Sequence, residues 1–314
     1  MNRKEMGRFV TWLVVIIIFL VLFSKIEVAG VADALRHVNK TLFFASLLIS
    51  LVAQFAISPA LYRAILRMLG CGLTFSEAAV IKLGSIPLKA SLPFKMGELV
   101  KVAYLKKIHD LPYAMGLYSL IIGYAVAFSI QLAIILSGWL LAHLSLARAI
   151  SLAAFFLMLL MIVVYVTLQG SVNFIIRFVK RIYREQGNVE MTKQGGFHGN
   201  FAPVVFYSLL FECCKLLAIF MLFRAFGIYI PAPSFLVFAT LSLFVSDLPL
   251  TPWGLGMRET SVVTLFSGYS APETLLASSM AMSFVNRVFP ALICLLIMRP
   301  FLLRLSSSIT TDQI

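Results

Sequence analysis

The sequence predicts an all-α protein, a polytopic bundle of membrane helices that forms a single transmembrane domain over residues 1–314. Hydrophobic residues occupy 61% of the positions and charged residues only 12%, about half the charged share of a soluble domain. The mean hydropathy is +0.98. Apolar runs also recur that are long enough to cross a hydrocarbon core of about 30 Å. Because backbone groups inside lipid find no water, such runs must form helices or parts of buried hairpins.

Six of the apolar runs have the length of full crossings: Phe9–Phe23, Leu42–Leu61, Ala114–Leu141, Ile150–Leu168, Ala202–Phe226 and Pro272–Met298. The first follows three basic residues, as in a secretory signal, but residues 24–27 make a poor cleavage site. We therefore expect it to be an uncleaved first helix. Two further apolar segments, 73–106 and 234–268, are interrupted by Pro, Gly and charged residues.

The connection at about 170–200 carries the strongest topological signal. Its five basic residues outnumber its two acidic ones, which predicts a cytoplasmic position. Phe174, Phe178 and Ile182 recur every four residues, and the basic residues fall on the opposite face. This pattern is typical of an amphipathic helix in the headgroup layer, and a solvated loop is the alternative.

Other basic residues predict which side of the membrane each segment faces. Arg63 and Arg67 mark a cytoplasmic end, as do Lys101, Lys106 and Lys107. Arg299 and Arg304 place the C-terminus there too. The N-terminus is then cytoplasmic as well. Each broken segment must cross an even number of times, so 73–106 opens to the cytoplasm and 234–268 to the outside. Each is either a re-entrant hairpin or a pair of short, tilted spans.

The two broken segments share a motif. Leu92-Pro93 is followed by Gly97-Glu98, and Leu248-Pro249 is followed by Gly256 and Glu259. Pro93 and Pro249 stand 156 positions apart, almost half the chain. Each half reads as crossing, crossing, broken segment, crossing. Because three crossings is an odd number, the sequence predicts two inverted repeats, at about 9–142 and 150–299, as in many transporters.

The breaks also predict a binding site for a lipid headgroup. Proline and glycine leave free backbone N–H groups at a helix start, and these groups attract anions. The helix-break residues are Pro93, Gly97, Pro249, Pro252, Gly254 and Gly256. A charge at the bilayer centre costs at least about 2.5 kcal/mol, so ionisable residues near the breaks mark a pathway. The candidate substrate-binding residues are Lys89, Lys95, Glu98, Lys101, Asp247, Arg258, Glu259 and Arg287.

The same residues also admit a purely structural interpretation. Glu98 lies three positions from both Lys95 and Lys101, a spacing at which helical side chains neutralise each other. Glu212 and Lys215 have that spacing too and form a candidate supporting polar pair. Arg258 has several acids within reach. We favour function for the whole set of residues around the breaks, because the two segments carry it together.

The remaining composition excludes several classes. The net charge of +13 is concentrated at the ends of apolar runs, where it suits anionic headgroups and not nucleic acid. The four His and four Cys residues show no ligand spacing, so we expect no metal and no cofactor. There is no phosphate-binding loop for a nucleotide. Movement of a substrate would be passive or coupled to an ion gradient, with Glu98, Asp247 and Glu259 as candidate proton carriers.

At its motif residues the sequence resembles the flippase-like family that includes the transmembrane region of lysylphosphatidylglycerol synthases. The resemblance rests on Leu92–Lys101 with Tyr104-Leu105, and on Leu248–Glu259. It extends to Arg287 and Glu212, which stand where family members often carry an Arg and an acid. It covers about residues 9–300. Gly123-Tyr124 departs from the family, which often has Glu-Arg there, so this member dispenses with that pair or handles a different headgroup.

The resemblance implies lipid handling. We expect a flippase or transporter that moves an anionic, aminoacylated, glycosylated or isoprenoid-linked lipid between leaflets of the cell (inner, cytoplasmic) membrane. Synthase activity is not expected, because residues 299–314 are too few for the aminoacyl-transfer domain of bifunctional members. The alternatives are a membrane-embedded enzyme of lipid or glycan assembly, and an accessory partner of a membrane glycosyltransferase or lipid-modifying enzyme. Conversion of a polyprenyl-phosphate substrate would indicate the former.

Overall fold

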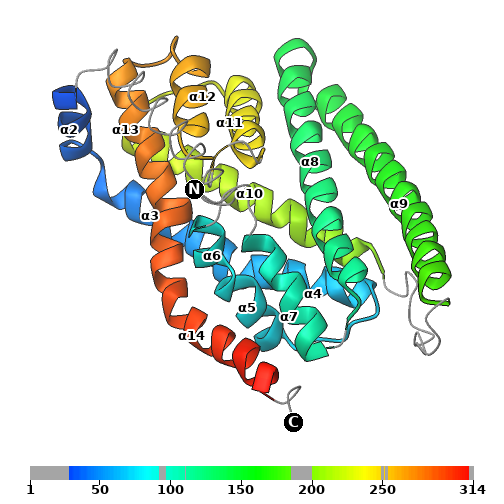
Figure 1. Ribbon diagram of the computed structural model, residues 1–314. Coiled ribbons are helices and arrows are strands. Elements are labelled where there is room, and N and C mark those ends of the chain that lie inside the picture. Colours follow the sequence, from blue (N-terminus) through cyan, green and yellow to red (C-terminus); the bar gives the residue numbers. More distant parts are fainter. Residues whose placement is uncertain are drawn as a thin grey trace, which may run out of the picture.

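The computed structural model describes residues 28–91, 97–109, 111–184, 200–248, 251 and 254–310. Every regular element within these residues is a helix (Figure 1). The prediction of an all-α fold is confirmed. The predicted crossing Phe9–Phe23 lies outside the described residues.

Five helical stretches of the described chain are long and apolar enough to cross a membrane. They are Lys40–Met68, Tyr113–His143, Leu146–Val166, Ala202–Ala225 and Pro272–Met298. Each coincides with one of the predicted crossings to within a few residues at most boundaries. The chain is therefore a multi-pass membrane protein.

Two of these crossings contain a turn of π-helix. The first consists of α3 (Lys40–Val52), η1 (Ala53–Ile57) and α4 (Ser58–Met68). The last consists of α13 (Pro272–Ser283), η4 (Phe284–Val288) and α14 (Phe289–Thr310). The first begins with a local cap, because the Asn39 side chain accepts a hydrogen bond from the backbone N–H of Leu42 at 3.2 Å.

The crossing that precedes the basic connection is longer than predicted. Helix α8 (Tyr113–His143) turns into α9 (Leu146–Arg184), which runs without interruption past the end of the apolar stretch. The first part of the connection at 170–200 therefore extends the crossing helix and does not start a new one. The side chains of the amphipathic pattern and residues 185–199 lie outside the described part.

Each broken segment consists of helical arms on either side of its proline motif. The first contains α5 (Phe75–Gly84), α6 (Ile86–Ser91) and α7 (Leu99–His109). The second contains α11 (Ala232–Asp247) and α12 (Met257–Leu265). Figure 1 shows the first segment in the lower half of the molecule and the second in the upper half. Pro93, Lys95, Pro249 and Pro252 lie outside the described residues.

The crossings ahead of the two broken segments end in the same way. After α4, Gly70 adopts φ 85° and the N–H of Cys71 donates to Leu66 O at 2.8 Å. After α10 (Ala202–Ala225), Gly227 adopts φ 70° and the N–H of Ile228 donates to Phe223 O at 2.9 Å. Both ends are left-handed glycine caps, which stop the helix and reverse the chain.

The broken segments pack against crossings from the other half of the chain. Helix α8 lies along α11, and α14 lies along α5 and α6. The ring of Phe301 on α14 stacks on that of Tyr104 on α7, with centroids 4.8 Å apart. Helices α3 and α10 pack together between these pairs. A short helix, α2 (Val28–Arg36), covers α13 through Val31.

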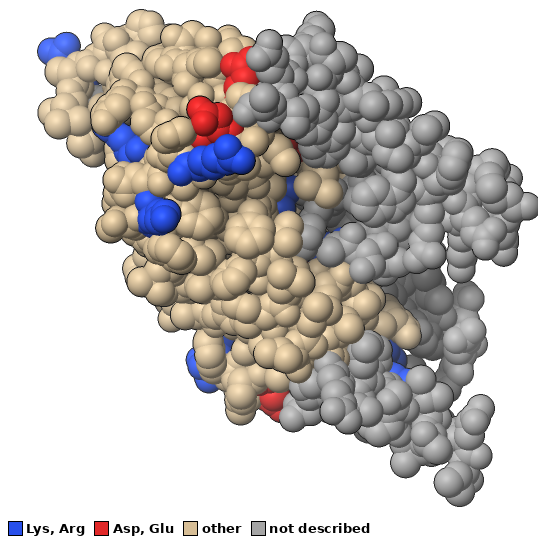
Figure 2. Space-filling model, turned by 90° about the vertical axis from the view of Figure 1, so that its left-hand side faces the viewer, with Lys and Arg blue, Asp and Glu red and all other residues tan. Residues whose placement is uncertain are grey.

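The outer surface of the bundle suits a lipid environment. Large apolar side chains such as Phe44, Leu48, Phe155 and Leu296 are exposed. Figure 2 shows that charged residues occupy only small groups on the described part of one face. A monomeric soluble protein rarely exposes so continuous an apolar surface.

Candidate functional site

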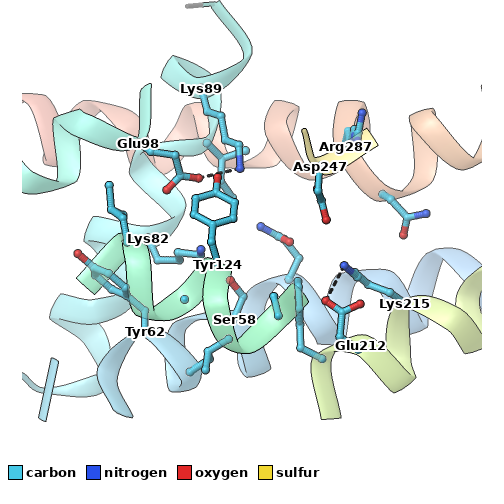
Figure 3. Close-up of a pocket in the computed structure, with 18 of the residues that line it drawn as sticks. Ser58, Tyr62, Lys82, Lys89, Glu98, Tyr124, Glu212, Lys215, Asp247 and Arg287 are labelled. Atoms are coloured by element: carbon cyan, nitrogen blue, oxygen red, sulfur yellow. Dashed lines mark hydrogen bonds and ion pairs between the residues drawn. The ribbon is translucent and has the colours of Figure 1, made fainter. Parts of the chain in front are cut away.

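A cavity of about 240 Å³ is lined by residues of both broken segments (Figure 3). The first segment contributes Lys82, Lys89 and Glu98 to its lining, and the second contributes Asp247 and Arg258. The crossings supply the rest of the wall, with residues from η1, α4, α8, α10, η4 and the start of α14. Segments that are far apart in the sequence therefore share one cavity inside a membrane protein.

The first broken segment brings three lysines to one carboxylate. Glu98 Oε1 lies 2.7 Å from Lys89 Nζ, and Glu98 Oε2 forms an ion pair with Lys101. Lys82 on α5 lines the same side of the cavity. Lys101 is only 2% exposed, and its ammonium lies 5.4 Å from the centre of the Tyr62 ring. One negative charge thus faces three positive charges on this side.

Gly97 makes this arrangement of Glu98 possible. A Cβ atom at position 97 would lie 2.2 Å from the backbone N of Lys89, a distance that no real side chain tolerates. Only glycine lets the start of α7 approach the backbone of α6 so closely. This contact holds Glu98 beside Lys89.

On the opposite side, an amide connects two carboxylates. Gln131 on α8 donates from Nε2 to Glu212 Oε1 at 3.5 Å and to Asp247 Oδ2 at 3.3 Å. Glu212 also accepts from Lys215 Nζ at 2.9 Å. The structural pairing of Glu212 with Lys215 that the sequence suggested is therefore present, and Gln131 ties it to the end of α11.

Two arginines complete this side of the cavity. Arg287 donates from Nη2 to Ser246 Oγ at 3.1 Å. Arg258 is only 3% exposed, yet its Nε and Nη1 atoms have no hydrogen-bond partner among the described residues, and neither does Arg287 Nη1. Unsatisfied donors on a buried cation are costly, so they indicate that a group outside the described chain accepts from them.

Glu259 has a different position from the other predicted residues. Its carboxylate accepts from the backbone N–H of Gly256 and from Ser283 Oγ, both at 2.6 Å. It is not part of the cavity lining. Glu259 therefore caps the start of α12 and ties it to α13, which positions the adjacent Arg258.

The second break depends on glycine as the first one does. Gly254 has φ +65°, and a Cβ atom there would lie 2.3 Å from Ser246 O. Gly256 has φ 79°. These conformations bring the start of α12 against the end of α11, so that Arg258 and Asp247 reach the same cavity.

Both π-helical turns lie at the cavity. Gln54 of η1 and Asn286 of η4 line it together with Arg287. Ser50 Oγ donates to Asn286 Oδ1 at 2.8 Å and connects the two crossings. Single π-turns inside long helices are frequent at functional sites, because the extra residue rotates polar side chains inward.

The structure brings most of the predicted residues together. The predicted residues that line the cavity are Lys89, Glu98, Lys101, Glu212, Lys215, Asp247, Arg258 and Arg287. Lys95 lies outside the described residues, and Gly97, Gly254 and Gly256 shape the breaks. Within the described residues, no three metal-binding side chains converge.

Several lining residues were not predicted. Lys82 could have been predicted, because a lysine inside an apolar segment is as unfavourable in the bilayer as the lysines that were predicted. Tyr62, Gln131 and Asn286 carried none, since each sits singly in a long apolar helix. Tyr124 lies between the two charged sides (Figure 3).

The chain matches a known protein family over most of its length. A family model described as the lysylphosphatidylglycerol synthase TM region matches residues 9–294. This range includes both broken segments and all lining residues. No curated protein sequence matches the chain.

Proposed function

Because the chain belongs to the family of lysylphosphatidylglycerol synthase transmembrane regions, we propose that it is a lipid flippase or transporter. Its substrate is an anionic, aminoacylated, glycosylated or isoprenoid-linked lipid, which it moves between the leaflets of the cell membrane. It acts without synthase chemistry of its own. Its partners are membrane lipids, and a membrane glycosyltransferase or lipid-modifying enzyme is the class of protein that would supply or use them.

The observation that carries this proposal is the charged cavity within a bundle of apolar helices. A headgroup cannot cross the hydrocarbon core alone, because its charges would lose their hydration. The cavity replaces that hydration with charged groups, among them arginine donors that find no acceptor within the described residues, while the acyl chains stay in the surrounding lipid. The exposed apolar side chains of the crossings are compatible with such chains.

Matched positions support the inverted-repeat part of the proposal. An offset of 157 residues relates Gly70 to Gly227 and Gly97 to Gly254, both of which are pairs with equivalent roles. The same offset relates Lys101 to Arg258, the buried cation near the start of each second arm. The packing is reciprocal as well, because the last crossing of each half lies along the broken segment of the other.

We propose further that both broken segments are re-entrant, with both chain termini in the cytoplasm. The first segment opens to the cytoplasm and the second to the outside. Each half then offers its break to the cavity from one leaflet, so a headgroup could pass from one break to the other. This is the arrangement of transporters whose binding sites lie between discontinuous helices.

Reconstitution of the purified chain into vesicles tests the proposal. Fluorescent lipid analogues in the inner leaflet become accessible to an external quencher only if they are moved. We expect faster exposure of anionic analogues than in protein-free vesicles. If exposure is unchanged for every anionic lipid, the transporter function is wrong.

A variant that fills the cavity tests whether lipid movement depends on it, and a second variant outside the cavity is the matched control. Gly123 lines the cavity, and a Cβ atom there meets only Ile65 Cδ1 at an ordinary 3.6 Å. Gly123→Leu should therefore fold and fill part of the cavity, with at least a tenfold slower exposure. Gly72→Leu places the same side chain in open space outside the cavity and should move lipid at the unaltered rate.

A further inference from the structure

The cavity carries an excess of positive charge. Its described lining contains six cations, namely Lys82, Lys89, Lys101, Lys215, Arg258 and Arg287, and three carboxylates, namely Glu98, Glu212 and Asp247. The buried Glu259, just outside the lining, also acts electrostatically on both arginines, which leaves a surplus of two positive charges. Such a surplus in a buried site is strongly unfavourable unless an anion offsets it. The excess positive charge of the lining therefore indicates how much negative charge the bound ligand carries.

The carboxylates are already engaged by the protein. Glu98 is shared by Lys89 and Lys101, and Glu212 is neutralised by Lys215. Asp247 accepts from Gln131 and interacts electrostatically with both arginines. An ammonium group on a lipid would thus find no carboxylate that lacks a positive partner.

The unsatisfied donors belong to the two arginines. Arg258 and Arg287 lie close enough to repel each other, and three of their N–H-bearing atoms lack acceptors among the described residues. Two guanidinium groups that face one space fit the oxygens of a phosphate, which each can bind in a bidentate manner. In the described part of the chain, Glu212 Oε2 and Gln131 Oε1 have no partner either, and they suit a hydroxyl group of the same ligand.

The size of the positive excess distinguishes phosphodiester headgroups from phosphomonoester headgroups. A phosphodiester headgroup such as that of phosphatidylglycerol carries one negative charge, and a lysine attached through its carboxyl group adds two ammonium groups, which make the net charge positive. A phosphomonoester carries about −1.5 to −2 at pH 7 and three terminal acceptor oxygens. Only the monoester approaches the surplus of the cavity.

We propose that the lipid bound in this cavity ends in a phosphomonoester and carries no amine, and that Arg258 and Arg287 bind the phosphate. This inference rests on the proposed function and narrows its substrate to one class. Phosphatidic acid and polyprenyl phosphates have this chemistry. Aminoacylated lipids are excluded by the positive charge that they add.

Binding measurements on the purified full chain in detergent test the inference. The probes are phosphatidic acid, phosphatidylglycerol and lysyl-phosphatidylglycerol with identical short acyl chains, together with a short polyprenyl phosphate. We expect the two monoesters to bind at least tenfold more tightly than phosphatidylglycerol, and the lysylated lipid to bind most weakly. Lysyl-phosphatidylglycerol binding as tightly as phosphatidic acid would overturn the proposal.

Variants locate the binding to the arginines. Arg258→Gln should weaken monoester binding about tenfold, since a hydrogen bond to a charged group has roughly that effect. Arg258→Lys keeps the charge and should recover part of the affinity. Arg224→Gln, a cation that stacks on Phe220 and Tyr229 outside the cavity, should bind as the unaltered chain does. Equal affinity in Arg258→Gln and the unaltered chain would contradict the proposal.

The wild-type ranking alone remains decisive if Arg258→Gln does not fold. The vesicle assay separates this inference from the proposed function. If the chain binds phosphomonoester lipids but moves no lipid in vesicles, the proposed transporter function is wrong and the assignment of the headgroup still holds. If lysyl-phosphatidylglycerol moves faster than phosphatidic acid, the assignment of the headgroup is wrong and the proposed transporter function still holds.

Discussion

Glu98 accepts ion pairs from lysines on both arms of the first broken segment. Lys89 precedes the break and Lys101 follows it. The carboxylate therefore joins the two arms and also reduces the charge of the cavity. The pair with Lys101 was foreseeable from its helical spacing, whereas the pair with Lys89 depends on the chain folding back at Gly97.

Replacement of Glu98 should test this joint role. In Glu98→Gln, Lys89 and Lys101 would remain buried without a negative partner, and loss of one partner of a buried ion pair costs about 3–5 kcal/mol. We expect a markedly lower thermal unfolding temperature of the purified protein in detergent. An added phosphomonoester lipid should restore part of this loss, because it returns negative charge to the cavity.

The control for this variant is an exposed acidic residue. Asp33 contacts His37, and both side chains are largely solvent-exposed. Asp33→Asn should alter the unfolding temperature little, as surface pairs contribute about 0–1 kcal/mol. If Glu98→Gln unfolds at the temperature of Asp33→Asn, Glu98 does not join the two arms.

Single residues whose partners lie far away in the sequence could not be predicted as part of the site. The spacing of Glu212 and Lys215 revealed their pair, but nothing near Gln131 in the sequence indicates that it reaches Asp247. That contact depends on α8 and α11, which are separated by two crossings in the sequence. Convergence of distant helices is a property of packing, and helical periodicity does not encode it.

The helical elements show the opposite case, because the proline and glycine motifs predicted both breaks. The described helices end at Ser91 and Asp247, directly before the two Leu-Pro motifs. The extension of α9 to Arg184 and the π-turns η1 and η4 were not predictable. The hydropathy pattern reports burial, and it does not distinguish one helical hydrogen-bonding pattern from another.

Alanine at the break glycines should disrupt these elements. In Gly97→Ala the new Cβ would overlap the Lys89 backbone, and in Gly254→Ala it would overlap Ser246 O and require φ +65°. Overpacking costs roughly 1–3 kcal/mol, and the left-handed conformation adds about 1–2 kcal/mol. We expect lower unfolding temperatures and at least tenfold slower lipid exposure in vesicles.

Gly72→Ala is the matched substitution for both variants. A Cβ atom at position 72 meets nothing within 4 Å. Its unfolding temperature and transport rate should equal those of the unaltered chain. Breaks that tolerate alanine as well as position 72 does would contradict the close approach of their arms.

At the scale of the whole molecule, the proposed orientation can be tested with single cysteines. In a chain without its four native cysteines, Ser145→Cys lies in the exposed turn between α8 and α9, and Asn200→Cys is exposed before α10. An impermeant thiol reagent should label Ser145→Cys in intact cells. Asn200→Cys should react only after permeabilisation, because the basic connection beside it is predicted to be cytoplasmic.

The opposite labelling pattern would invert the proposed topology. Labelling of both positions from outside would mean that α9 does not cross. The five crossings of the described chain were predictable because hydropathy and length are sufficient to identify a span. Reciprocal packing of the halves was not, since it follows from contacts among helices that the sequence separates widely.

The stacking of Phe301 on Tyr104 has a consequence for biosynthesis. A Cβ atom at Gly84 would also collide with Phe301, so α14 seats itself closely against α5 and α7. The ribosome makes α14 long after the lysine-rich segment that it covers, α5 to α7, has entered the bilayer. Until α14 is made, that segment therefore lacks part of its packing. Premature termination before residue 289 would leave this segment without the helix that covers it.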